Sequence, residues 1–139
     1  MPSDEKLTTA VQCIDDLPMI EDYPTADSRF VFVQEEFALF YTLVKPHSTM
    51  NSHVHPKAHQ FSFIVQGTGQ VEMGDQRLDV KKGMCIRIPA GVYHSWYNPN
   101  DQMLDYLEVK IPSRGSPDMI RYCKDIFPNI DDRKLGIGI

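Results

Sequence analysis

The chain lacks any apolar run that approaches the roughly 20 residues needed to span a bilayer. Its first residues are acidic and polar, whereas a secretory signal has a basic end followed by an apolar stretch. No dense basic cluster is present either, because 14 Lys and Arg stand against 19 Asp and Glu and leave a formal net charge of −5. We therefore expect neither a membrane nor a nucleic acid as the partner.

Cysteine is also scarce. The three cysteines, Cys13, Cys85 and Cys123, are an odd number and lie far apart. They show neither the Cys-x-x-Cys spacing nor the mixed Cys/His spacing of zinc sites. We expect reduced thiols in a cytoplasmic protein. The length of 139 residues with 42% hydrophobic residues is enough for one domain with its own core.

Strand-like sequence is abundant. Short runs rich in aromatic and β-branched residues occur at 29–33, 37–44, 61–65, 70–73, 77–80, 84–88, 92–97 and 103–111. Segments with Gly, Pro, Asn or Asp separate them and favour turns. About eight strands at this spacing predict an all-β sandwich or barrel.

The two ends of the chain differ from this middle part. Residues 1–28 contain scattered acidic residues and one strand-like run at 9–14, so we interpret them as an N-terminal arm. Residues 29–115 would form the barrel, and residues 116–139 a C-terminal helix and tail within the same domain. Ser116 is a suitable cap for that helix, Pro117 suits its first turn, and Pro128 would end it.

Histidine is concentrated in one stretch, with four of the five histidines between residues 47 and 59. Side chains on a strand alternate between its faces, so His53 and His55 would share one face and could bind one metal ion. The pair alone is equally compatible with ordinary surface or core histidines. A third ligand is needed to decide.

Residues 83–98 supply that third histidine, His94. They read Gly, five residues, Pro-x-Gly, two residues, His94, three residues, Asn. With this pattern the chain resembles the cupin superfamily, because it matches every specified position of the second cupin motif. The first cupin motif fits at His53, His55 and Gly67, while His47 stands where that motif has a Gly. The resemblance covers residues 47–98 and implies a double-stranded β-helix, or jelly-roll, barrel that holds one metal ion.

By that resemblance the ligands of a divalent Mn, Fe, Ni or Zn ion are His53, His55, Gln60 and His94. Gln60 occupies the position where the family has a glutamate, and its neutral carbonyl leaves the ion with its full double charge. This favours Lewis-acid chemistry over redox chemistry. His59 is the rival ligand, but strand parity turns it away from the ion if Gln60 faces it, unless a bulge at 56–57 inverts the strand.

A polar row lies near the end of the last predicted strand. Tyr106, Glu108 and Lys110 share one strand face, where they could act as acid, base and anion anchor inside the barrel, or form a solvated outer face with an ion pair. A subgroup of small cupins that opens unsaturated uronate sugars looks similar at this point. Glu108, Pro112 and Arg114 fit its acid-x-aromatic-x-Pro-x-Arg pattern, but Lys110 replaces the aromatic residue.

The resemblance and these residues imply a metal-dependent lyase, isomerase or cyclase that acts on a small oxygenated substrate such as a sugar acid or a dicarbonyl. Glu108 or Tyr106 would move the proton. One alternative is an Fe(II)-dependent dioxygenase, for which three histidines suffice. A second alternative is a non-catalytic cupin that binds a small ligand or serves as a sensory module. Trp96, which shares the face of His94, would be either a wall of the binding pocket or ordinary core.

The first two predicted strands carry more apolar surface than a small barrel can bury on its inside. The residues concerned are Phe30, Phe32, Phe37, Leu39 and Tyr41. We therefore expect a homodimer in which one sheet packs against a second copy.

Overall fold

The computed structural model describes residues 11–17, 19–22, 26–33 and 36–112. Ten strands and one short 3-10 helix lie in these ranges. They are η1 (Ile14–Asp16), β1 (Met19–Asp22), β2 (Ala26–Val33), β3 (Ala38–Val44), β4 (Ser48–Thr49), β5 (His59–Gln66), β6 (Thr68–Met73), β7 (Gln76–Lys81), β8 (Cys85–Ile88), β9 (His94–Asn98) and β10 (Leu104–Ile111). The helix predicted from Ser116 and the tail after it lie outside the described residues.

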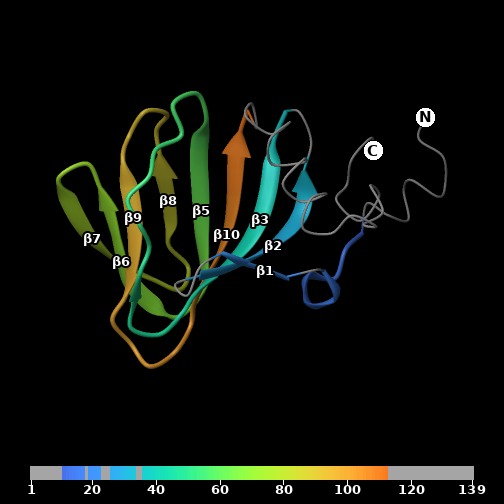
Figure 1. Ribbon diagram of the computed structural model, residues 1–139, viewed down its shortest axis with the longest axis horizontal. Coiled ribbons are helices and arrows are strands. Elements are labelled where there is room, and N and C mark those ends of the chain that lie inside the picture. The colour runs from blue at the N-terminus through green and yellow to red at the C-terminus, as the bar shows by residue number, and fades with distance from the viewer. Residues whose placement is uncertain (1–10, 18, 23–25, 34–35, 113–139) are drawn as a thin grey trace.

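The strands form two antiparallel sheets, which confirms the all-β prediction (Figure 1). The larger sheet has the order β1-β2-β3-β10-β5-β8, and the smaller has the order β4-β9-β6-β7. Apolar side chains from both sheets meet in one core cluster, in which Val44, Ile64 and Tyr106 come from the larger sheet and Val71 and Trp96 from the smaller. A two-sheet sandwich with a shared apolar interior is how antiparallel sheets bury one face each.

The N-terminal part of the described chain joins the larger sheet. β1 pairs with β2, and β2 begins at Ala26, so strand structure occurs within the segment interpreted as an arm. The guanidinium of Arg29 donates hydrogen bonds to the carbonyl oxygens of Ile14, Asp15 and Leu17 at 3.3, 3.0 and 2.6 Å. These bonds hold η1 and the residue after it against the sheet. The boundaries of arm, barrel and C-terminal segment stay predictions.

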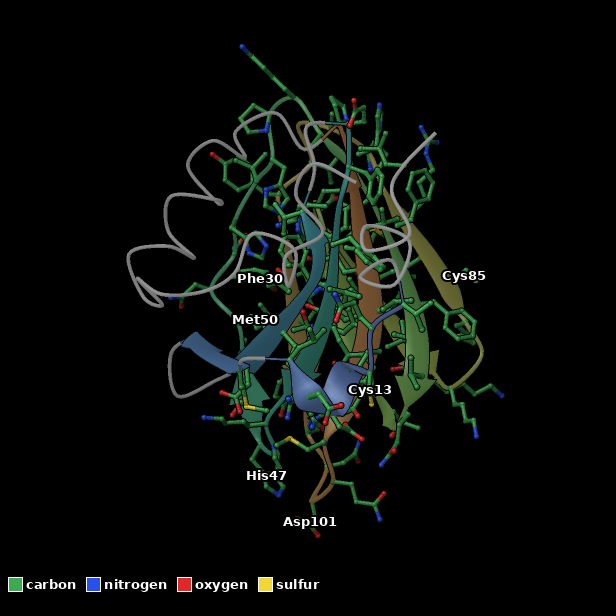
Figure 2. All side chains as sticks on the ribbon, turned by 90° about the vertical axis from the view of Figure 1, so that its right-hand side faces the viewer. Cys13, Phe30, His47, Met50, Cys85 and Asp101 are labelled. Carbon is green, nitrogen blue, oxygen red and sulfur yellow. The ribbon has the colours of Figure 1, made fainter. Side chains whose placement is uncertain are left out.

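Two positions of the first cupin motif have left-handed backbone. Gly67 has φ +88°, and a Cβ there would collide with the carbonyl oxygen of Met103, so only glycine fits. His47, in the place of the motif's other glycine, adopts φ 52°. Its exposed ring contacts the carboxylate of Asp101 at 2.6 Å, and Figure 2 shows both residues at the same end of the molecule. His47 thus adopts a left-handed conformation that a glycine takes more readily.

No helix in the described residues is long and apolar enough to cross a membrane. Cys13 and Cys85 are free and exposed, and Cys123 lies outside the described ranges, so the reduced state of the thiols stays a prediction.

The outer face of the larger sheet carries an apolar groove. Phe30 is not part of it, because its ring is buried against Phe40 with 4.8 Å between the centroids. The groove is lined by Leu39, Phe61, Ser62, Phe63, Cys85, Ile86, Arg87, Leu107 and Val109. Of the five residues on which the homodimer prediction rests, Leu39 lines this groove. Phe61 and Phe63 of β5 line it as well.

The homodimer stays a prediction with a direct check. We expect twice the chain mass by light scattering at micromolar concentration, and monomers for Phe63→Ser, because the substitution places a hydroxyl in a buried apolar contact. Leu78→Ser on β7 is the matched control, since Phe63 is 45% and Leu78 43% exposed, and it should remain a dimer. A monomeric wild-type protein would contradict the prediction.

Candidate metal centre

Backbone hydrogen bonds bring the two histidine motifs together. His53 and His94 form an isolated antiparallel bridge, in which each N–H donates to the other's carbonyl at 2.9 Å. The N–H of Gly91 donates to the carbonyl of His55 at 3.0 Å. The argument from side-chain alternation assumed that His53 and His55 lie on a regular strand, and they do not. The bridge to β9, rather than strand alternation, sets their positions.

The three histidine rings converge. One nitrogen from each of His53, His55 and His94 lies within 4.8 Å of the others, so the three rings could close around one ion. The ring centroids of His53 and His94 are 4.2 Å apart, and that of His55 is 5.2 Å from each of them. Among the described His, Cys, Asp and Glu side chains, these three form a group that could hold a metal ion.

Hydrogen bonds at the far side of two rings fix which nitrogen is available. Nδ1 of His94 donates to the carbonyl of Val92 at 2.9 Å, and Nδ1 of His53 donates to the carbonyl of Asn51 at 2.9 Å. A carbonyl oxygen only accepts, so the proton of each neutral ring is on Nδ1 and the Nε2 lone pair is free. A backbone carbonyl behind a ligating histidine is the usual arrangement in metal sites.

Three buried acceptor atoms on the predicted ligands have no hydrogen-bond partner among the described residues. They are Nε2 of His55, Nε2 of His94 and Oε1 of Gln60. A buried polar atom without a partner costs roughly 1–3 kcal/mol. Acceptors left unpaired in this way suit a cation, so the residues present fit a divalent metal ion.

His55 and His94, the two inner histidines, are neutral at pH 7, as metal ligands must be. Burial, followed by the charges of Lys110, His53 and His94, lowers the pKa of His55 from 6.5 to about 3. Burial also lowers the pKa of His94 to about 4, against the opposing effect of its hydrogen bond to Val92. Metal binding needs the neutral ring, so at pH 7 neither histidine must first lose a proton.

Gln60 faces the barrel interior, as strand parity predicted. Its side chain is 1% exposed, whereas Phe61, the next residue on β5, is 41% exposed. Nε2 of Gln60 donates to Oε2 of Glu108 at 2.6 Å and to Oγ of Ser62 at 3.1 Å. The rival His59 uses Nδ1 to accept a hydrogen bond from the N–H of Ala90 at 3.2 Å. Whether Gln60 completes a ligand set stays a prediction.

The polar row on β10 also faces inward. Tyr106 and Glu108 are buried, which excludes the solvated outer face for them. Lys110 lies 3.6 Å from Oε1 of Glu108, and its ammonium sits 5.0 Å above the ring centroid of Phe40. The charge of Lys110 contributes to the lowered pKa of both His55 and His94.

Tyr106, the first residue of this row, packs against Trp96. Their rings stack with centroids 4.3 Å apart, and Trp96 is fully buried in the core cluster. The hydroxyl of Tyr106 donates to Sδ of Met50 at 3.8 Å. Trp96 is therefore core, the second of the two interpretations left open for it.

The sequence reasoning did not find Ser62, which holds the amide of Gln60, or Phe40, which lies under Lys110. Strand parity on β5 and β3 places both side chains on the inner face and was the available signal. It was not informative alone, because the pairing of β10 with both β3 and β5 was unknown.

Asn98, the last residue of the second motif, has a structural role: its Nδ2 donates to the carbonyls of Val44 and Gln102 at 3.0 and 2.7 Å.

Comparison with known proteins identifies the family and the fold. The family model Cupin_2, described as a cupin domain, matches residues 40–110, just over half of the chain. The xanthan biosynthesis protein XanB of Xanthomonas campestris pv. campestris is 32% identical over 80 residues, which is 57% of this chain but 17% of that protein. The chain thus spans less than a fifth of the curated relatives it matches.

Solved structures with the same fold include KdgF from Halomonas sp., with a TM-score of 0.68, 18% identity, and coverage of 77% of this chain and 96% of that one. The polyketide cyclase RemF from Streptomyces resistomycificus has a TM-score of 0.68 and 18% identity, covering 74% of this chain and 79% of that one. A cupin of the RmlC-like type from Shewanella frigidimarina gives a TM-score of 0.68 at 14% identity, covering 74% of this chain and 90% of that one. At these identities the likeness concerns the jelly-roll fold.

Proposed function

We propose that this chain, which belongs to the cupin domain family, is an enzyme that holds one divalent metal ion on His53, His55, Gln60 and His94. The observation that carries the proposal is the convergence of three histidines, two of which, His55 and His94, have a buried Nε2 without a hydrogen-bond partner; Oε1 of Gln60 is a further buried atom without one. The ion would be Mn, Fe, Ni or Zn. Bound there, it would act as a Lewis acid that polarises a carbonyl or hydroxyl of the substrate.

The residues around the histidines suggest an anionic, oxygenated substrate, such as a sugar acid or a dicarbonyl. Lys110 is a cation whose charge acts on His55 and His94, and its side chain is 17% exposed, so it can reach a substrate carboxylate or enolate. Glu108 is the candidate for moving a proton. Its Oε2 is taken up by a hydrogen bond of 2.6 Å from Gln60, whereas its Oε1 is held less closely, at 3.6 Å from Lys110. Tyr106 is the second candidate.

The proposed reaction class is a lyase, an isomerase or a cyclase. Each needs a polarised carbonyl and a proton transfer, and none needs a change in the oxidation state of the metal. A cyclase has support from one solved neighbour, which is described as a polyketide cyclase. A cytoplasmic location is part of the proposal and rests on the two exposed free thiols.

An Fe(II)-dependent dioxygenase is the second candidate, because the three histidines form a ligating group without any carboxylate. A non-catalytic cupin that binds a small ligand is the third. The three candidates differ in what they require. The first needs metal only, the second needs iron and oxygen together, and the third turns over nothing.

The test is to load metal-free protein with Mn(II), Fe(II), Ni(II) or Zn(II) and follow a panel of sugar acids and dicarbonyls by NMR, under argon and in air. We expect turnover with at least one metal at equal rates in both atmospheres. Turnover that requires oxygen would establish the dioxygenase instead. No turnover with any metal would leave the non-catalytic binder.

The variant Lys110→Met tests the substrate class. It keeps the length of the side chain but removes the charge, and a hydrogen bond to a charged group contributes roughly 1.5–3 kcal/mol. We expect KM for a carboxylate substrate to rise roughly 10- to 100-fold. Lys81→Met, on an exposed position of β7, is the control and should leave KM unchanged. An unchanged KM in Lys110→Met would remove the lysine from substrate binding.

A further inference from the structure

We infer that Glu108 is a positioning residue that aims the carbonyl oxygen of Gln60 at the histidine group and adds a carboxylate charge one hydrogen bond away from it. The inference rests on the metal-binding part of the proposed function. It concerns how the fourth ligand is held and not the reaction catalysed.

The two ends of the Gln60 amide differ in the hydrogen bonds that they can make. An amide group has a donor end and an acceptor end of nearly the same shape, so a buried glutamine can be turned either way unless its neighbours choose. An ionised carboxylate only accepts hydrogen bonds. Glu108 therefore tolerates only the NH2 end of Gln60, and the contact of 2.6 Å between Nε2 and Oε2 is that arrangement.

The second amide proton is also used. Nε2 of Gln60 donates to Oγ of Ser62 at 3.1 Å, so both donors of the amide have partners. Oε1 is left as the unpartnered atom of the group, and it is fully buried. The two neighbours together determine that the buried, unpartnered atom of the amide is an oxygen and not a nitrogen.

Strand register explains why these side chains meet. β10 pairs with β5 in a register that places Glu108 opposite Ser62 and Lys110 opposite Gln60. Glu108 reaches diagonally across to Gln60, which is within the range of long side chains on adjacent antiparallel strands. Lys110 holds Oε1 of Glu108 at 3.6 Å, so the carboxylate is fixed from both sides. Charged partners behind a ligand orient it and raise its donor strength.

A double-mutant cycle on Co(II) affinity tests the inference. Titrations of metal-free protein with Co(II) alone, followed by visible absorption, give Kd for wild type, Glu108→Gln, Gln60→Glu and the double variant. In the wild-type background Glu108→Gln should weaken binding roughly 10- to 100-fold, since a glutamine at 108 can also donate and so lets the amide of Gln60 turn.

In the Gln60→Glu background the sign should reverse. Two carboxylates would face each other there, and Glu108→Gln replaces one of them by an amide that donates to the other. The same substitution should then strengthen Co(II) binding, by roughly tenfold. A residue that merely supports the fold would act in one direction in both backgrounds. Glu108→Gln effects of equal sign, or none at all, would overturn the inference. Glu72→Gln is the control and should not change Kd. Glu72 lies on the other sheet, where it forms an exposed ion pair with Arg77.

A metal-free measurement covers the case in which Gln60→Glu fails to fold. The side-chain NH2 signals of Gln60 in the 15N spectrum, identified by their loss in Gln60→Leu, should lie downfield in wild type and move upfield in Glu108→Gln. Signals at unbonded positions in the wild type would overturn the inference. If the affinity pattern appears but no substrate turns over, the proposed function fails while the inference stands. If substrate turns over but the sign does not reverse, the inference fails while the proposed function stands.

Discussion

Replacing His94 by alanine should weaken divalent-metal binding by roughly 100-fold or more. Zinc sites with four ligands bind with about 10–16 kcal/mol, so one ligand contributes on the order of 3 kcal/mol, which is about 100-fold in Kd. His94 is suited to this test because it is buried, its Nδ1 is held by Val92, and its Nε2 is unpaired. Isothermal titration of the metal-free variant with Zn(II) measures the change.

Two further variants control this experiment. His55→Ala removes a ligand whose ring is less buried than that of His94, so it should fold well and lose affinity to a similar extent. His59→Ala removes the rival ligand, which faces away and accepts a bond from Ala90, and it should bind Zn(II) as the wild type does. Loss of affinity in His59→Ala with normal binding by His94→Ala would reverse the ligand assignment.

The metal-free protein should lose stability steeply as the pH falls from 6.5 to about 4. In the unfolded chain both inner histidines have an ordinary pKa near 6.5 and take up protons in this range. In the folded chain burial lowers the pKa to about 3 for His55 and about 4 for His94, so their rings stay neutral. The unfolded state then binds more protons than the folded state, and the free energy of unfolding must fall with the pH.

The size of this loss is on the order of 2–4 kcal/mol between pH 7 and pH 4, less than the two full shifts would give because water reaches the partly exposed His55. Urea unfolding of the metal-free protein at pH 7, 6, 5 and 4 measures it. His55→Gln removes one of the two titrating groups and should show a shallower fall. Equal slopes for wild type and His55→Gln would mean that other groups cause the acid sensitivity.

Most of the fold could be predicted because its strands carry their own local signals. The run 37–44 alternates between buried and partly exposed side chains as β3, and its neighbours are separated by turn residues. β4 was missed because two residues, Ser48 and Thr49, are too few to show a period. β1 was missed because Met19–Asp22 contains two acidic residues and no alternation, and its pairing with β2 is a tertiary effect.

The candidate site was only partly predictable for a similar reason. The histidines and Gln60 stand in motifs that are local in sequence, so they could be named from spacing. The contact between Gln60 and Glu108 joins positions 48 residues apart, and it exists only because β10 lies between β3 and β5. Strand parity favoured the inner face for Gln60 but left the face of Glu108 open, and it could not show that the two strands are neighbours. Non-local pairing of this kind leaves no periodic trace in the chain.

The reciprocal backbone bonds between His53 and His94 have a consequence for how the protein would acquire its ion. They join backbone atoms only and use none of the ring nitrogens, so the two motifs can be held side by side before an ion binds. A site assembled in advance does not reshape itself around one preferred ion. Affinities would then follow the general order of the divalent transition metals, and occupancy inside a cell would be governed by which ion the cell keeps in supply. The same chain expressed in media of different metal content should be recovered with different ions in the same place.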